Sequence, residues 1–298
     1  MIVNIYDYLT RSGVYHLCRQ IDLPDEVTES ILGHVENDSF NAVNYYFTTL
    51  FSPKTVRWSV EKIDALCPEN GESVNRGFKI MAVFLAAALH TRELYAKKGI
   101  DDAVFIQTMS VFNCSVRDCK EIYGHYGFDR ALWCCQHLAL TVFRLGTLEF
   151  EMRIVTNPSH FGFAEEESIP VLWVHIPSDA LMTREELDNS YKTARTFFNQ
   201  YYPDFKYRCI CCGAWLLSPI LKEILPPGSK ILEFQSDFKI TKIYPDDESY
   251  FIRVFKQQDK PDDLNRLPEN TSLQRAVRKR LMEGGTIGRA EGVLINST

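Results

Sequence analysis

The sequence lacks any apolar run close to the ~20 residues that a helix needs to span a bilayer, so no membrane-spanning segment is predicted. It also lacks a surplus of positive charge. Lys and Arg number 33 against 39 Asp and Glu, which gives a formal net charge of −6. General nucleic-acid-binding proteins usually carry a basic surplus. We therefore expect a globular protein that binds neither nucleic acid nor membranes.

The first residues, MIVNIYDYLT, contain no basic stretch followed by a long apolar one, so no signal peptide is predicted and a cytoplasmic location is expected. Nine cysteines is an odd number, and thiols in that compartment are kept reduced. Structural zinc sites commonly use CxxC pairs, and none occurs here. The closely spaced cysteines are Cys114 with Cys119, Cys134 with Cys135, and Cys209 with Cys211 and Cys212. No metal site is predicted.

Apolar residues recur at three- and four-residue intervals through the first half of the chain, the spacing of helices with one buried face. The clearest case is 74–97, where Phe78, Met81 and Phe84 begin a broad apolar stripe and Gly99 follows the end. Helices are predicted over 24–35, 39–51, 74–97, 101–112, 117–123 and 131–145. We expect Gly146 to end the last of them, with no β-hairpin before it.

The period changes after Gly146, where Leu148–Val155 alternates apolar with charged residues as a half-buried strand does. Capping-box patterns at Thr183 and Thr271 predict helix starts. Strands are predicted over 148–155, 171–176, 207–212, 231–238, 240–244 and 249–255, helices over 183–202, 218–225 and 271–284, and a hairpin over 286–295. The predicted fold is α+β, with an all-helical domain over 1–146 followed by a mixed α/β domain over 147–298.

Four stretches together resemble a known family. They are GFDRALWCCQHLALTVFRLGTLEFE (127–151), VLWVHIP (171–177), CGAWLLSPILKEILPPGSKILEFQSDF (212–238) and LPENTSLQRAVRKRLMEGG (267–285). Their order and spacing are similar to those of a bacterial acyltransferase family with a helical N-terminal domain and a GNAT-like C-terminal domain. The chain departs from this family at Ala214, where Ser is usual, and at Ser178-Asp179-Ala180, where the loop commonly contains Gly.

The resemblance implies an acyl-CoA-dependent N-acyltransferase with a small amine as acceptor and acyl-CoA as co-substrate. In such a fold two central strands, here 171–176 and 207–212, diverge and offer backbone N–H groups to the developing oxyanion. The CoA phosphates would lie at the helix N-terminus formed by Thr183 and Arg184. The alternative is a catalytically silent ligand-binding or interaction module. Ala214, which lacks the hydroxyl, and the missing loop Gly favour that alternative. Gln235, His175 and the helix N-terminus at Thr183 leave the enzyme open.

Three residues are candidates for catalysis. His175, near the end of a central strand, could be a general base or a buried structural histidine. Cys212 could be a nucleophile or a proton donor to the leaving thiol, or it could pack as a small hydrophobe. Gln235 shares a face of a predicted strand with Asp237, and that face could line the acceptor site or face solvent.

The candidates for cofactor binding include two more side chains with alternative roles. Trp215 could stack on adenine or cover the core. Arg275 lies at helical spacing from Arg278 and Lys279, and this group could hold a 3′-phosphate or form a solvated basic face. The full set of predicted acyl-CoA contacts is Ile176, Ser178, Thr183, Arg184, Trp215 and Arg275.

Overall fold

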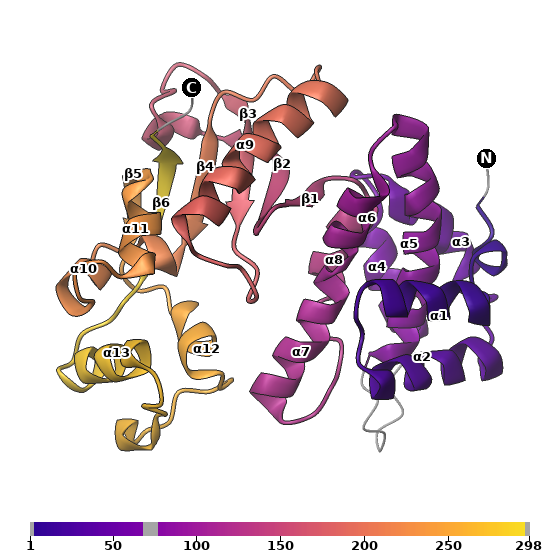
Figure 1. Cartoon of the computed structure of the whole chain (residues 1–298), viewed down its shortest axis with the longest axis horizontal. Coiled ribbons are helices and arrows are strands. Elements are labelled where there is room, and N and C mark those ends of the chain that lie inside the picture. The colour runs from indigo at the N-terminus through magenta and orange to yellow at the C-terminus, as the bar shows by residue number, and fades with distance from the viewer. Residues whose placement is uncertain (1–2, 68–76, 296–298) are drawn as a thin grey trace. The chain divides into compact units, whose positions relative to one another are not determined.

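The computed structural model describes residues 3–67 and 77–295 of the chain. It contains two compact units, Met1–Leu145 and Gly146–Thr298 (Figure 1). The first unit is mainly helical, and the second contains a mixed sheet with helices. The predicted α+β class, a helical part followed by a mixed α/β part, is therefore confirmed. In the described part of the chain, no helix has both the length and the apolar character needed to cross a membrane.

The N-terminal unit is built around α5 (Phe78–Lys98), whose side chains are buried on almost all sides. This helix packs against α1, α2, α6 and α8. The other helices are α1 (Arg11–Gln20), α2 (Asp25–Asn37), α3 (Asn44–Phe47), α4 (Val56–Leu66), α6 (Asp102–Met109), α7 (Val111–Tyr123) and α8 (Ala131–Leu138). The unit ends with strand β1 (Val142–Leu145), which packs against α6.

Two helix predictions in this unit are corrected by the structure. The helix predicted over 131–145 ends at Leu138, because Leu140 has a φ of 54°, which an α-helix cannot contain, and β1 follows. The helix predicted over 39–51 is divided into α3 and a 3-10 turn, Thr48–Phe51. Residues 74–76, the predicted start of the long helix, lie outside the described residues.

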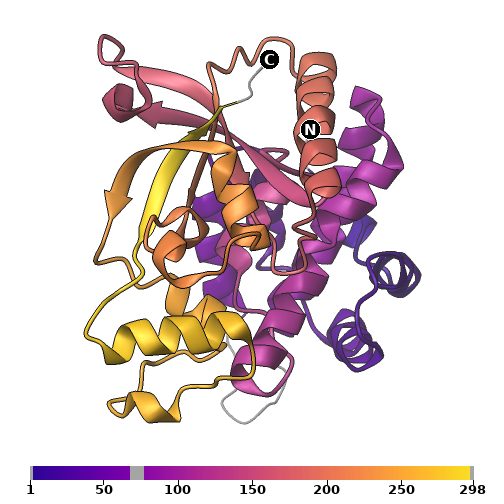
Figure 2. The ribbon, with the colours of Figure 1, turned by 60° about the vertical axis from the view of Figure 1, so that its left-hand side comes forward.

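The strands of the C-terminal unit lie in the order β2-β3-β4-β6-β5. Their bounds are β2 (Leu148–Thr156), β3 (Ser168–His175), β4 (Ile210–Ala214), β5 (Phe238–Tyr244) and β6 (Arg289–Leu294). Strands β3 and β4 are parallel and the other neighbouring pairs are antiparallel. A parallel pair needs a crossover connection, which α9 (Arg184–Tyr201) provides. Figure 2 shows α9 running along the sheet.

A second group of helices closes the unit: α10 (Leu221–Ile224), α11 (Lys230–Ser236), α12 (Tyr250–Phe255) and α13 (Ser272–Met282). Three of them contribute to one apolar cluster, formed by Leu221, Tyr250, Phe251, Val254, Phe255, Leu267, Val277, Leu281 and Ile287. The capping box predicted at Thr271 and Gln274 is present at the start of α13.

Three strand predictions are wrong in this part of the chain. Residues 231–236 belong to α11, and 250–255 form α12. The buried residues of α12 recur at the spacing of one helix face, and they are Tyr250, Phe251, Val254 and Phe255. The predicted hairpin over 286–295 is instead a single strand, β6, inserted between β4 and β5.

The two faces of the sheet are packed differently. On one face, Tyr191 of α9 lies edge-on to Phe238 of β5, with 6.5 Å between ring centroids. On the other face, the Trp173 ring lies against Gly213 of β4. A β-carbon at Gly213 would come within 2.6 Å of Cζ2 of Trp173 and 3.1 Å of Cγ of Glu291. Only glycine therefore leaves room for both buried side chains.

Replacing Gly213 by alanine is expected to destabilise the protein by about 1–3 kcal/mol, the usual cost of overpacking a filled core. Urea unfolding would measure the loss. The matched control is Gly33→Ala inside α2, where no atom lies within 4 Å of the added carbon. That substitution should raise stability by about 0.5–1 kcal/mol. A Gly213→Ala protein as stable as wild type would contradict the close packing of Trp173.

Candidate active site

The parallel pairing of β3 with β4 ends before either strand does. The paired residues are Leu172 with Ile210, Trp173 with Cys211 and Val174 with Cys212. Beyond the last pair, β3 continues to His175, while Gly213 and Ala214 of β4 remain paired to β6. At the carboxyl ends of β3 and β4, the backbone groups of the two strands are therefore no longer hydrogen-bonded to each other. This is the location that the sequence predicted for the reacting thioester.

His175 is the last residue of β3, and its ring is paired with a carboxylate from the neighbouring strand. Its Nε2 lies 2.8 Å from Oε2 of Glu151 on β2. The side chains are 23% and 11% exposed, so the ring is accessible while the carboxylate is largely enclosed. The register of β2 and β3 places Glu151 opposite Trp173 and Glu149 opposite His175, which puts all four on the same face.

Arg153 binds both oxygens of the Glu151 carboxylate, including the one that contacts His175. Its Nε lies 3.1 Å from Oε1 and its Nη2 lies 2.5 Å from Oε2. This two-point contact fits the planar guanidinium to the planar carboxylate. The guanidinium also lies over the Trp173 ring, 4.5 Å from its centroid. Arg153 therefore fixes both the carboxylate and the aromatic ring next to it.

These contacts keep Glu151 ionised. Burial alone would raise the pKa of its carboxyl group, but hydrogen bonds from His175 and Arg153, with the charge of Arg153, lower it below the ordinary value of 4.5. An ionised carboxylate only accepts hydrogen bonds. The Nε2 atom of His175 therefore carries a proton, which it donates to the Glu151 carboxylate.

A second histidine–glutamate pair lies on the same face of the sheet. His160, in the 3-10 turn Pro158–Phe161, places Nε2 3.1 Å from Oε2 of Glu291 on β6. Arg289 donates to the other oxygen of Glu291 at 3.0 Å. Phe161 of the turn packs edge-on against Trp173. The turn is therefore attached to the sheet by an apolar and a polar contact.

The sequence did not identify Glu151, Arg153, His160 or Glu291 as site residues. The alternation in 148–155 did place Glu149, Glu151 and Arg153 on one face, but such a face is normally assigned to solvent. Glu149 and Glu151 are in fact 3% and 8% exposed. The burial of two carboxylates on one strand face is the signal that identifies them as site residues. This burial can be recognised only once the neighbouring strand is known.

The helix start predicted at Thr183 is present at the beginning of α9. Thr183 is the N-cap, and its side chain accepts from the backbone N–H of Glu186 at 3.4 Å. Ser178, in the loop before the helix, is exposed, and Ile176 is half-buried. Arg184 is already paired, with Nη1 2.6 Å from Asp237 and Nη2 2.8 Å from Asp188. A phosphate at this position would compete with those two carboxylates for Arg184.

Two of the predicted catalytic residues lie inside the protein. Cys212 is fully buried, and burial together with the charge of Glu291 raises the pKa of its thiol. Gln235 belongs to helix α11, which corrects its predicted place on a strand face beside Asp237. Its Nε2 donates to the carbonyl oxygens of Ser218 at 2.8 Å and Leu216 at 3.3 Å. Both environments are those of residues that pack and connect the core.

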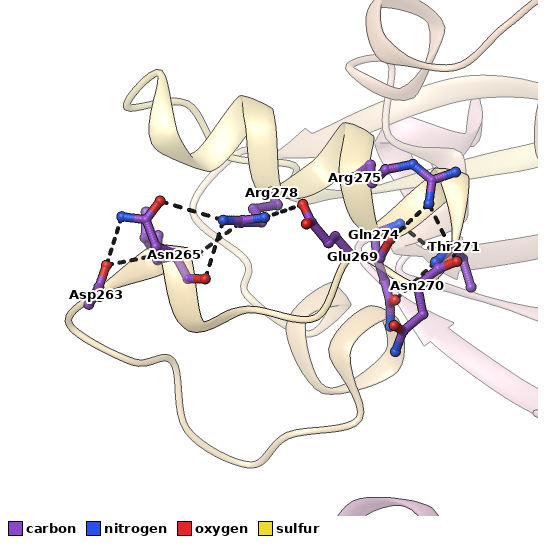
Figure 3. A network of polar contacts seen from close by, with 9 residues as sticks. Asp263, Asn265, Glu269, Asn270, Thr271, Gln274, Arg275 and Arg278 are labelled. Carbon is purple, nitrogen blue, oxygen red and sulfur yellow. Dashed lines mark hydrogen bonds and ion pairs between the residues drawn. The ribbon is translucent and has the colours of Figure 1, made fainter.

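The two remaining predicted contacts also have partners within the fold. Trp215 packs against the apolar cluster of α12 and α13. Arg275 donates to the carbonyl oxygens of Glu269 and Asn270, at 2.8 and 3.4 Å, in the loop before α13 (Figure 3). Arg278 is bonded to the Glu269 carboxylate and to Asn265 in the same network. The structure does not bring Arg275 together with Thr183 through any described contact.

Comparison with known proteins defines the class of this fold. A family model described as a GNAT-like C-terminal domain matches residues 142–294, and one described as an N-acyltransferase N-terminal domain matches residues 13–140. The chain therefore belongs to the acyltransferase family with a GNAT-like C-terminal domain, as its resemblance predicted. A comparison with curated protein sequences finds no match.

Solved structures with the same fold are acyltransferases. A mutant acyltransferase in complex with octanoyl-CoA has a TM-score of 0.80 and 24% identity over 95% of this chain and 87% of its own. An acyltransferase in complex with decanoyl-CoA and teicoplanin has a TM-score of 0.75 and 23% identity, with the same coverage. At this identity the similarity establishes the fold. Among the described residues, no group of three or more His, Cys, Asp or Glu side chains could hold a metal ion.

The lowered pKa of Glu151 predicts a specific pH dependence of stability. A carboxyl group with a depressed folded-state pKa stabilises the protein above its unfolded-state pKa, and this contribution is lost as the pH falls through the folded-state value. The difference in unfolding free energy between wild type and Glu151→Gln should therefore shrink as the pH falls below about 4.5. Urea unfolding at several pH values measures this difference. A difference that stays constant down to pH 3 would show that Glu151 is not held ionised.

Proposed function

We propose that this chain is an acyl-CoA-dependent N-acyltransferase that moves an acyl group from a CoA thioester to the amine of a small-molecule acceptor. The observation that carries the proposal is the His175–Glu151 pair, located where the pairing of β3 with β4 ends. Family membership supports acyl transfer as the reaction class. The proposal includes a cytoplasmic location and domains over 1–146 and 147–298.

In the proposed mechanism His175 acts as the general base. Acyl transfer requires a neutral amine, and most amines are protonated at pH 7, so a base must take a proton from the ammonium group before its nitrogen can attack the thioester carbonyl. Glu151 orients the ring and stabilises the imidazolium that forms. Since Arg153 keeps Glu151 ionised, this stabilisation is in place before the proton arrives. Glu151 is a positioning residue, because it acts through His175.

The backbone would stabilise the charge that develops on the thioester oxygen. Amide N–H groups beyond the last β3–β4 pair are released from the ladder and can donate to an oxyanion. The CoA phosphates are assigned to the start of α9, where the first-turn N–H groups and the positive end of the helix dipole favour an anion. The octanoyl-CoA and decanoyl-CoA complexes of the structural relatives make medium-chain acyl-CoA the first co-substrate to test.

The alternative is a catalytically silent module that binds a ligand without turnover. Ala214 favours it, since this chain lacks the hydroxyl usual at that position and with it a proton donor for the leaving thiol. Cys212 does not replace that donor, because its thiol is buried on the face opposite to His175. The enzyme requires both acyl-CoA binding and turnover, whereas a silent ligand-binding or interaction module requires no turnover, so turnover is the measurement that separates them.

Binding and turnover test the proposal together. At about 100 times its Kd, a ligand stabilises the folded state by about 2.7 kcal/mol, which corresponds to a rise in Tm of several degrees. We expect this rise with octanoyl-CoA or decanoyl-CoA, and release of CoA thiol when an amine is added, with teicoplanin and simple primary amines as trial acceptors. No rise with any acyl-CoA would reject the proposal, while binding without turnover would favour the silent module.

His175→Ala is expected to lower kcat by about 10²–10⁴-fold because the variant lacks the base. Folding and acyl-CoA binding should be retained, because Arg153 still pairs with Glu151. His175→Gln, which keeps a hydrogen-bond donor for Glu151, should be equally inactive. The matched control is His160→Gln, which alters the other histidine–glutamate pair and should retain turnover. Normal activity of a folded His175→Gln variant would exclude the assigned role.

Asp179→Gly is expected to tighten acyl-CoA binding. The substitution removes a negative charge from the loop before α9 and gives the backbone the freedom to approach the phosphates closely. The effect should be larger at low salt, because exposed charges are screened. Equal Kd values for wild type and variant at low salt would place the phosphates elsewhere.

A further inference from the structure

A cavity of about 320 Å³ lies between the last turns of α9 and the start of β4. Its volume is at the lower end of the range for small-molecule sites, ~300–1,000 Å³. Arg195 and Asn199, one helical turn apart, line the cavity from α9, and Lys206 and Tyr207 line it from the loop before β4. The cavity is therefore built from two segments that meet at one end of the sheet.

The lining of this cavity is positively charged. It includes Arg195, Lys206 and Arg208, and no Asp or Glu is among the described lining residues. Arg208 contributes least, because its Nη1 lies 2.6 Å from the Glu166 carboxylate. The carbonyl end of α9 opposes the positive charge with about half a negative charge. Arg195 and Lys206 outweigh it and leave a surplus of about 1.5 positive charges, so the cavity favours an anion.

Aromatic residues form much of the remaining wall. Tyr202, Phe205 and Tyr207 line the cavity and are each half-buried. Walls of this kind suit a ligand that contains a flat ring. Burial raises the pKa of the Tyr207 hydroxyl, and the nearby charge of Arg195 opposes this rise. The hydroxyl stays protonated at neutral pH, so it can donate a hydrogen bond to an anion held by Arg195.

We propose that this cavity binds the monophosphate ester of a small molecule with a flat ring, which is the chemistry of a nucleoside monophosphate. Arg195 and Lys206 hold the phosphate, and the ring packs against the aromatic residues of the wall. A phosphate monoester carries about 1.5 to 2 negative charges at pH 7, which matches the positive surplus of the lining. A carboxylate has a single charge and two acceptor oxygens, so it matches the lining less well.

The cavity is separate from the start of α9, to which the CoA phosphates are assigned. Arg195 follows Arg184 by eleven positions, or roughly 16 Å along the helix axis. Arg195, Lys206 and Tyr207 have no role in the proposed acyl transfer. The inference therefore stands whether or not the chain is an acyltransferase.

The first test compares three probes on the full-length protein by isothermal titration. AMP has both the flat ring and the phosphate, adenosine lacks the phosphate, and ribose 5-phosphate lacks the ring. The Kd of AMP should be lower than that of either other probe by about tenfold or more. Added salt should raise the Kd of AMP, because exposed charges are screened. Binding of adenosine or of ribose 5-phosphate as tight as that of AMP would contradict the proposed ligand class.

The second test locates the site with variants. Lys206→Gln, in an exposed loop position, should raise the Kd of AMP about tenfold, and Arg195→Gln/Lys206→Gln should raise it about 100-fold. The matched control is Lys192→Gln, because Lys192 is an exposed lysine of α9 that is not among the described lining residues. It should leave the Kd unchanged. The Tm of each variant without ligand shows whether it is folded.

The third test separates this cavity from the acyl-CoA site. AMP should bind with the same Kd when decanoyl-CoA is saturating, and displacement of AMP by decanoyl-CoA would overturn the proposal. A protein that binds AMP but no acyl-CoA would support this inference and reject the proposed acyltransferase function. No binding of AMP, or equal AMP binding by wild type and the folded Lys206→Gln variant, would overturn the inference and leave the acyltransferase proposal intact.

Discussion

The buried carboxylate of Glu151 is the interaction on which the candidate site depends. An ionised carboxylate is costly to remove from water unless it is paired and hydrogen-bonded, and here one guanidinium and one imidazole meet that requirement. Removing one partner of such a buried group typically costs about 3–5 kcal/mol. The same contacts connect β2 to β3 and fix the orientation of His175. The Glu151 side chain therefore contributes both to the stability of the sheet and to the orientation of the proposed base.

The strands of the central sheet could be predicted from the sequence because each of them carries a local pattern of apolar or β-favouring residues. The strands over 148–155, 171–176 and 207–212 agree with β2, β3 and β4 to within a few residues. Alternation over 148–155, a continuous apolar run over 171–176 and β-favouring residues over 207–212 each identify a strand, but none of these patterns shows which strand lies beside it. The pairing of Glu151 with His175, 24 positions apart, depends on that register. His175 could therefore be predicted and its partner could not.

The errors have local physical causes. Lys230–Ser236 is a single short helix, and over seven residues the helical and strand periods place apolar residues at overlapping positions. Gln235 was assigned to a strand face for this reason, whereas its amide is bonded to carbonyl groups inside the core. At Leu140, a left-handed backbone conformation in a residue that rarely adopts it ends α8 without a glycine or proline to mark the change. The position of β6 is set by tertiary contacts with β4 and β5, and no local pattern encodes it.

The order of strands in the sheet affects how the C-terminal unit folds during synthesis. Strand β6, the last of the strands in chain order, lies between β4 and β5. Until residues 289–294 have left the ribosome, β4 and β5 each present an edge with unpaired backbone groups, the kind of edge that recruits strands from other chains. During synthesis, either a bound chaperone or rapid insertion of β6 would protect the unpaired edges of β4 and β5.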